Sequence, residues 1–280
     1  MINDQGRIST RRPLPHPHTP ILIALFALLW LLPDVAAWLA REPDEAWSRV
    51  QASGVIRFAT EASFHPFEGV GGDGVFFGLD IDVAREVARR LGAQAEFVNV
   101  GIDGLYDVLR VGQADASISA LPLDPARLGK WAYSRPYFDA GLVSIARMSD
   151  QLSVDQLSVI RDWPGRTIAV ALGSEGDARL RYYQRRAAGI QAATFDSVEE
   201  ALRAVEERRA DIAVVDGVTA RQLLAKQFDG LRIAAQLTSE PYAIAMWGEN
   251  VELYAAINRA LEAMQADGTL DRIVEEWMQK

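Results

Sequence analysis

Apolar and polar positions change their period several times along this chain, and the changes separate strand-like from helix-like segments. The clearest helix pattern lies in residues 78–91, GLDIDVAREVARRL. One face of this segment carries small and apolar residues: Val83, Ala84, Val87, Ala88 and Leu91. The opposite face carries charged residues: Arg85, Glu86, Arg89 and Arg90. The pattern predicts an amphipathic helix that packs on a sheet.

Two acidic residues stand at the start of this helix. We expect the Asp80 side chain to cap free backbone amides of the first turn. Asp82 adds negative charge near the positive end of the helix dipole. The two carboxylates are therefore interpreted as helix-start residues and not as a catalytic pair.

Strand-like and helix-like segments alternate through the rest of the chain. Short apolar runs predict strands at 55–60, 95–100, 116–120, 141–146, 167–171, 212–215 and 242–247. Helical periodicity predicts helices at 104–111, 125–131, 175–186, 197–208, 217–226, 251–265 and 270–278. Repeated strand–helix units predict mostly parallel sheets covered by helices on both faces. The alternation restarts after a polar stretch at 148–164, which indicates two lobes.

The N-terminal segment differs from the rest. Arg7, Arg11 and Arg12 precede an unbroken apolar run at 21–32, and small residues follow it. Twelve apolar residues are fewer than the roughly 20 that a membrane-spanning helix needs. We therefore expect residues 1–37 to be a signal peptide, with Val-Ala-Ala at 35–37 as the candidate cleavage site. The alternative is an uncleaved membrane anchor.

Composition and charge exclude several classes of function. The 280 residues are 49% hydrophobic and include no cysteine, which excludes disulfides, thiolate metal sites, a cysteine nucleophile and a lipid-anchored cysteine. The net charge of −9 without a basic stripe is unsuited to nucleic acid or an anionic membrane surface. His16, His18 and His65 are the only histidines, so we expect no metal site and no cofactor.

Several short motifs follow one another along residues 55–277. They are the GLDIDV start of the first helix, Gly112–Asp115, DPAR at 124–127, YSRPY at 133–137, Asp211 to Asp216, DGTL at 267–270, and Trp277. Together they resemble the bacterial extracellular solute-binding proteins of family 3, which capture polar amino acids and related solutes for ABC importers.

The resemblance implies an α/β, two-lobed, periplasmic-binding-protein-like (type II) fold with two hinge strands and a central cleft. It places residues 46–143 and 241–280 in the first lobe and residues 144–240 in the second. The interruption of the first lobe by the second is carried by the resemblance, because periodicity cannot show it.

The resemblance also implies ligand contacts. Arg127 matches an arginine whose planar guanidinium holds an α-carboxylate by two parallel bonds, and the alternative is a solvated surface arginine. Asp216 matches the acid that takes the α-ammonium, and the alternative is a helix cap. Ser174 opens a helix whose free amides suit a carboxylate, and it is also a good N-cap.

Three further residues match positions beside the ligand. Phe64 matches an aromatic ring that covers the ligand side chain, with core packing as the alternative. Ser119 matches a position that contacts the ammonium, through its backbone carbonyl if its hydroxyl points away. Glu61 matches a position where an acid reads a polar or cationic side chain.

Other positions depart from the family pattern. Pro122 and Glu175 replace hydroxyl residues, Asp124 replaces a threonine, Ile102 an aromatic residue, and Arg135 an aspartate. The candidate site is consequently rich in acids, with Glu61, Asp124, Glu175 and Asp216 against Arg127. Because unpaired buried charge is costly, we expect a ligand that is polar or cationic and not acidic.

The sequence thus predicts a monomeric periplasmic receptor, not an enzyme, that closes on a small ligand and delivers it to an ABC permease in the inner membrane. A first alternative is a cyclohexadienyl dehydratase-like enzyme on the same fold, with Glu175 or Asp124 as the proton donor. A second is a membrane-tethered ligand sensor. A sensor of this fold continues into a span and a signalling domain, which we do not expect here.

Overall fold

The computed structural model describes residues 44–150, 163–186 and 189–279. The expected signal peptide or anchor at 1–37 and most of the polar stretch at 148–164 lie outside these residues. None of the helices in the described ranges is long and apolar enough to cross a membrane.

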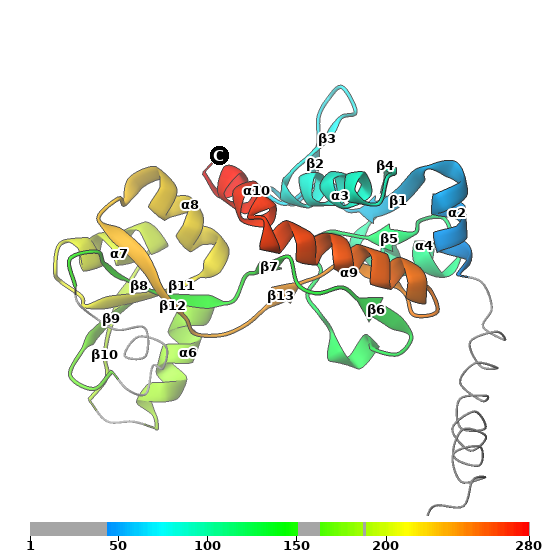
Figure 1. Cartoon of the computed structure of the whole chain (residues 1–280). Coiled ribbons are helices and arrows are strands. Elements are labelled where there is room, and N and C mark those ends of the chain that lie inside the picture. The colour runs from blue at the N-terminus through cyan, green and yellow to red at the C-terminus, as the bar shows by residue number, and fades with distance from the viewer. Residues whose placement is uncertain (1–43, 151–162, 187–188, 280) are drawn as a thin grey trace, which may run out of the picture. The chain divides into compact units, whose positions relative to one another are not determined.

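The first of two five-stranded sheets has the order β4-β1-β5-β14-β6 (Figure 1). Its strands are β1 (Val55–Thr60), β4 (Gln94–Asn99), β5 (Ala116–Ser117), β6 (Trp131–Tyr133) and β14 (Ala245–Trp247). Strand β1 pairs in parallel with β4 and β5, whereas β14 pairs antiparallel with β5 and β6. A strand from the C-terminal part of the chain therefore lies inside a sheet built otherwise from its first half.

The second sheet has the order β10-β9-β11-β8-β12. Its strands are β8 (Leu142–Arg147), β9 (Thr167–Ala171), β10 (Gln191–Phe195), β11 (Ile212–Asp216) and β12 (Leu231–Gln236). Strand β9 pairs in parallel with β10 and β11, and β8 pairs antiparallel with β11 and β12. Half of the pairings in each sheet are antiparallel, so the expectation of mostly parallel sheets was wrong.

The chain passes between the sheets twice. Strand β7 (Phe138–Asp139) leads from the first sheet toward the second, and β13 (Pro241–Tyr242) leads back. The two strands pair antiparallel with each other. This is the type II binding-protein architecture, with two α/β lobes and two connecting strands. The lobe boundaries at 143/144 and 240/241 stay a prediction.

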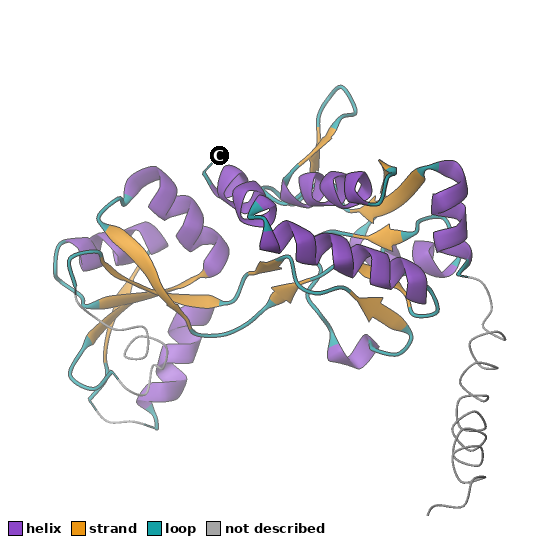
Figure 2. Cartoon of the chain, in the orientation of Figure 1, coloured by secondary structure: helices purple, strands orange, loops and turns teal. Residues whose placement is uncertain are grey.

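Helices cover both faces of each sheet (Figure 2). On the first sheet they are α2 (Glu45–Ser53), α3 (Leu79–Arg90), η1 (Ile102–Gly104), α4 (Asp107–Arg110), η2 (Pro125–Arg127), α9 (Val251–Ala266) and α10 (Thr269–Met278). On the second they are α6 (Glu175–Gln184), α7 (Val198–Glu206) and α8 (Gly217–Gln227). A small hairpin, β2 (Gly69–Val70) and β3 (Phe76–Phe77), precedes α3.

Alternation along the strands supplies two apolar layers per sheet, because successive side chains point to opposite faces. In β9, Ile168 and Val170 join the cluster that includes Trp163, whereas Ala169 joins the cluster under α7. In β11, Ile212 and Val214 contribute to one layer and Ala213 and Val215 to the other. The short apolar runs are therefore strands buried on both faces.

Each of the two sheets contains the same kind of hydrogen bond between neighbouring parallel strands. Asp115 Oδ2 accepts the backbone N–H of Arg57 at 2.8 Å, and Asp211 Oδ2 accepts that of Thr167 at 2.8 Å. Each aspartate precedes one strand and binds the strand beside it. Asp115 also forms ion pairs with the guanidinium groups of Arg57 and Arg49. Asp115 and Asp211 therefore hold neighbouring parallel strands together in their sheets.

The role expected for Asp80 at the start of α3 was wrong. The N-cap is Gly78, which has no side chain to accept a bond, and its φ of 134° is unsuited to other residues. A Cβ on Gly78 would lie 2.0 Å from the carbonyl oxygen of Phe67. The Asp80 side chain is fully buried and instead accepts the N–H of Ala120 at 2.6 Å. Asp82 keeps its expected place in the first turn.

Candidate functional site

Three predicted site positions follow the carboxyl ends of neighbouring strands in the first sheet. Glu61 follows β1, Ile102 follows β4 and Ser119 follows β5. Because β1 is parallel to both neighbours, these ends lie along one edge of the sheet. Ligands of open α/β sheets bind at this kind of edge.

Arg127 lies at the end of the short helix η2 and is held on two sides. Its Nε donates to Asp124 Oδ2 at 3.1 Å, and its guanidinium carbon lies 4.5 Å from the centre of the Tyr106 ring. Among the described residues, no partner is recorded for its Nη groups. These two contacts orient the guanidinium and leave its outer donors for a ligand.

Asp124 explains one departure from the family pattern. Its Oδ1 accepts the N–H of Ala126 at 2.9 Å, so the aspartate caps η2 as a threonine would. The Asp124 and Arg127 side chains are 42% and 49% exposed, and an ion pair this exposed is weak. Asp124 therefore orients Arg127 without consuming its capacity for an anion.

A cavity of about 330 Å³ surrounds Arg127. It is lined by Ile102, Asp103, Tyr106, Asp107, Leu121, Arg127, Lys130 and Trp131. Tyr106 and Lys130 were not predicted from the sequence to lie here. Tyr106 shares a 2.8 Å hydrogen bond with Tyr133, which belongs to the recognised YSRPY motif, so that motif was the only available signal.

Phe64 and Glu61 lie on the loop after β1. The Phe64 ring is 49% exposed and stacks on Phe67 with centroids 5.6 Å apart, so it is not a core residue. The Glu61 carboxylate accepts the Ser63 hydroxyl at 2.6 Å and is otherwise open. An exposed ring beside an open acid suits the predicted contacts with a ligand side chain.

Ser119 is buried, and its hydroxyl is already engaged. It accepts the Glu61 N–H at 3.0 Å and donates to Glu68 Oε1 at 2.7 Å. The hydroxyl therefore ties the ends of β1 and β5 together beneath the site. The alternative that the Ser119 backbone carbonyl contacts the ligand is therefore favoured over its hydroxyl and stays a prediction.

Ser174 follows the carboxyl end of β9, and Asp216 is the last residue of β11, the parallel neighbour of β9. Both are N-caps: Ser174 Oγ accepts the Asp177 N–H at 3.2 Å, and Asp216 Oδ1 accepts the Thr219 N–H at 2.8 Å. Glu175 is exposed in the first turn of α6. The capping roles given as alternatives are present, and each side chain keeps a further acceptor or donor.

The predicted residues divide into two sets by the sheet to which their segments belong, and among the predicted ligand residues Glu61 and Ser119 share a direct hydrogen bond. The first set contains Glu61, Phe64, Ser119 and Arg127, and the second contains Ser174, Glu175 and Asp216. Arg135 belongs to neither set. Its guanidinium lies 3.5 Å from the Glu262 carboxylate of α9, and its backbone N–H donates to Asn258 Oδ1, so both of these contacts are with α9.

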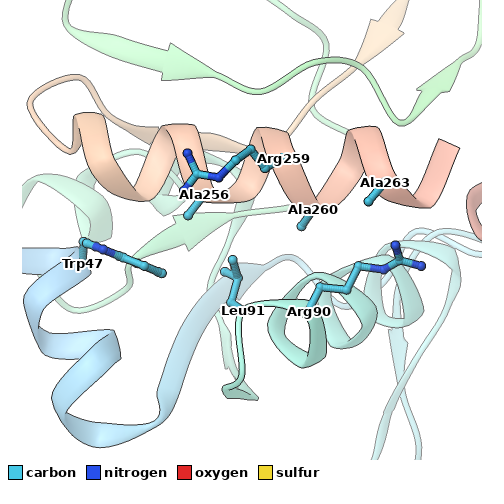
Figure 3. Close-up of a pocket in the computed structure, with 7 residues that line it drawn as sticks. All are labelled: Trp47, Arg90, Leu91, Ala256, Arg259, Ala260 and Ala263. Atoms are coloured by element: carbon cyan, nitrogen blue, oxygen red, sulfur yellow. The ribbon is translucent and has the colours of Figure 1, made fainter. Parts of the chain in front are cut away.

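A larger cavity lies elsewhere on the first sheet's helices. It measures about 460 Å³ between α2, α3 and α9. Figure 3 shows Trp47, Leu91 and Arg90 on one side and Ala256 and Ala260 on the other. The Arg90 guanidinium is occupied by Glu86 and Asp267 at 2.7 and 2.8 Å. None of the predicted ligand residues lines this cavity.

Comparison with known proteins agrees with this architecture. A putative ABC transporter arginine-binding protein of Escherichia coli is 26% identical over 82% of this chain and 93% of its own length. The open, unliganded L-cystine solute receptor of Neisseria gonorrhoeae has a TM-score of 0.68 at 26% identity, over 83% of this chain and 96% of the receptor. An ancestral cyclohexadienyl dehydratase has a TM-score of 0.69 at 25% identity, over 84% and 96% of the two chains.

Residues 56–280 match the family of bacterial extracellular solute-binding proteins, family 3. The match covers nearly all of the described structure, including both sheets and the two strands that connect them. It contains each motif on which the sequence resemblance rested. The chain belongs to the bacterial extracellular solute-binding proteins of family 3.

Proposed function

We propose that this protein captures a small polar or cationic α-amino acid and delivers it to an ABC-type permease. The observation that carries the proposal is the placement of Arg127. Asp124 and Tyr106 orient its guanidinium beside a 330 Å³ cavity at the sheet edge, and its Nη donors stay open. A carboxylate is the ligand group that matches two such donors.

The rest of the α-amino acid has partners in the two sets of residues. The carboxylate binds Arg127 and the free amides at the start of α6, beside Ser174. The ammonium binds Asp216 and the Ser119 carbonyl. Because these groups come from both lobes, the ligand makes its full set of contacts only in a closed state and stabilises that state.

Acidic residues favour a polar or cationic side chain on the ligand. Asp103 and Asp107 line the cavity that Arg127 also lines, and Glu61 follows β1 at the same edge of the sheet. A second acid on the ligand would face this group of carboxylates. Relatives named for arginine and cystine agree with this preference.

We further propose that the protein works in the periplasm as a monomer without a cofactor. The family is extracellular, and its members are named as parts of ABC transporters. The expected signal at 1–37 would export the chain, and the permease would be a separate membrane protein.

A thermal-shift screen tests the ligand class. Purified protein is heated with L-arginine, L-lysine, L-ornithine, L-glutamine, L-cystine or L-glutamate. A ligand that binds only the folded state raises Tm as its concentration exceeds Kd. We expect shifts from basic or neutral polar amino acids. A shift from glutamate, with none from arginine, lysine or glutamine, would reject the proposed preference.

The dehydratase relative supports a second candidate, an enzyme that acts on prephenate or arogenate. Its proton donor would be Glu175 or Asp124. Both acids are exposed, and Asp124 is paired with Arg127, so neither has the buried setting of a strong general acid. Binding is therefore the better-supported function. Formation of an aromatic product from prephenate would establish the enzyme instead.

A further inference from the structure

Two acids lie beneath the strand edge that carries Ser119. Glu68 is 2% exposed, and its Oε1 accepts the Ser119 hydroxyl at 2.7 Å. Asp80 is fully buried, and its Oδ2 accepts the N–H of Ala120 at 2.6 Å. Two consecutive residues of the candidate site are thus each held by a different buried carboxyl group.

The other oxygen of each acid has no hydrogen bond of ordinary geometry. Glu68 Oε2 and Asp80 Oδ1 are buried and without a hydrogen-bond partner among the described residues. No Lys or Arg of the described residues forms an ion pair with either acid. Two ionised carboxylates in this setting would repel each other and leave both oxygens unsatisfied. A single proton held between the groups removes the repulsion and supplies the missing donor.

The surroundings favour that proton. Burial raises the pKa of Glu68, and the neighbouring Asp80 charge raises it further. Burial also raises the pKa of Asp80, although the bond from the Ala120 N–H opposes this. The other titratable groups that act on the pair are Glu61 and the phenols of Tyr137 and Tyr242. The Tyr137 phenol acts as a donor to Asp80 and lowers its pKa, but none of the three groups carries a positive charge that would offset two carboxylates.

The acids hold the peptide between Ser119 and Ala120 in an unusual backbone conformation. Its φ of 43° lies in the left-handed region, which alanine rarely adopts without surrounding support. The peptide between Ser119 and Ala120 is planar and trans, so its N–H and C=O point in opposite directions. With the N–H directed at buried Asp80, the Ser119 carbonyl is directed away from the acids. No turn or loop bond of the described backbone ends on that carbonyl.

We propose that Glu68 and Asp80 share one proton and act together as positioning residues that aim the Ser119 carbonyl at the ligand's ammonium. Glu68 fixes the Ser119 side chain, and Asp80 fixes the following peptide. This role rests on the proposed function, because it assumes an ammonium-bearing ligand. Loss of the shared proton at alkaline pH would separate the acids and turn the carbonyl.

Two variants of Glu68 separate the charge from the hydrogen bonds. The Glu68→Gln variant keeps an acceptor for the Ser119 hydroxyl and adds a permanent N–H donor toward Asp80, so its side chain mimics the protonated acid. Leu in Glu68→Leu removes both bonds at similar volume. Titration with L-arginine at pH 7 is expected to give Kd within about threefold of wild type for the first variant and at least tenfold weaker for the second. Circular dichroism checks that both are folded.

Two further measurements test the shared proton and the positioning role separately. Between pH 7 and pH 10, wild type should lose more L-arginine affinity than Glu68→Gln, which has no proton to lose. Without ligand, an infrared difference spectrum of wild type minus Glu68→Gln at pH 7 should contain a protonated-carboxyl band. If the band is absent, the acids do not share a proton. If folded Glu68→Leu binds L-arginine with wild-type affinity, the positioning role is wrong. If wild type binds none of the amino acids, the proposed function fails together with the positioning role, while the band still decides the proton.

Discussion

Asp82 Oδ2 accepts a hydrogen bond from the indole Nε1 of Trp277 at 2.7 Å, across 195 residues of sequence. The bond joins the two ends of the family pattern, the start of α3 and the end of α10. Phe77, just before α3, stacks on the same indole with centroids 6.3 Å apart. These two contacts bind α10, at the C-terminal end of the chain, to α3 and to Phe77 just before it.

Replacing Trp277 by Phe tests this link. The ring stacking can persist, but the bond to a charged acceptor is lost. Asp82 is 33% exposed and can turn to water, so we expect a loss of about 1–2 kcal/mol in unfolding free energy. Urea denaturation measures it. Asp82→Asn should keep this bond, because an amide oxygen still accepts the indole N–H, and should lose only the exposed ion pair with Arg85. An unchanged unfolding free energy in Trp277→Phe would contradict the assigned bond.

Arg127→Ala should abolish the thermal shift caused by an amino acid that binds wild type. Losing a paired donor of the ligand's carboxylate costs about 2–4 kcal/mol of binding free energy, or a factor of about 30 to 1,000 in Kd. Arg135→Ala is the matched control, because Arg135 faces α9 and should keep the full shift. A full shift in Arg127→Ala would reject the carboxylate assignment.

Asp115→Asn should weaken the first sheet. Burial acts to raise the pKa of Asp115, but hydrogen bonds from Arg57 and Arg49 outweigh it and hold the pKa below its usual value. This contribution is present above the unfolded pKa near 4 and is lost as pH falls below it. We expect about 1–3 kcal/mol at pH 7 and less at pH 3, measured by urea denaturation. A cost that did not shrink in acid would point to packing instead.

The buried acids under Ser119 should have the opposite pH dependence. The pKa values of Glu68 and Asp80 are raised, so the folded state retains protons that the unfolded state has released. Unfolding free energy should therefore fall as pH rises above about 4.5, by at most about 1.4 kcal/mol per pH unit for each retained proton. Glu68→Gln should flatten this slope in denaturation at pH 5 to 9. An unchanged slope would mean that Glu68 is ionised.

Gly78→Ala should destabilise the protein severely. The added Cβ would lie 2.0 Å from the Phe67 carbonyl oxygen, at a φ that alanine avoids. We expect a loss of about 3 kcal/mol or more, read from the urea midpoint. Gly72→Ala is the control, because a Cβ there meets no atom within 4 Å. Similar midpoints for the two variants would show that α3 can shift to accept the methyl group.

Sequence periodicity predicted the long elements well. Strands β1 and β9 were predicted at their observed bounds, and α3, α7, α8, α9 and α10 within two residues. The strands that it missed have weak patterns. Strand β10 is mostly exposed and offers few apolar positions, and β12 mixes buried and half-buried residues around a bulge. Two- and three-residue strands such as β6 and β7 are too short to show a period.

The candidate site was predictable in outline only. The family resemblance proposed Arg127, Ser174 and Asp216 as ligand residues, and that assignment stays a prediction. Burial could not be predicted in the same way, since Asp80 fits a helix cap on local grounds and only the fold places it against Ala120. The partner of Ser119 could not be predicted either, because its hydroxyl donates to Glu68 and no local sequence pattern connects the two residues. Contacts across 40 or more residues decide both cases.

The position of β14 between β5 and β6 makes the two sheets unequal in what they need from the C-terminal part of the chain. Every strand of the second sheet lies within residues 142–236, so its strand pairing needs nothing beyond them. The first sheet has an open slot between β5 and β6 until residues 245–247 fill it, and its helices α9 and α10 lie later still in the chain. A protein shortened before residue 245 should therefore form a finished second sheet beside an unfinished first one.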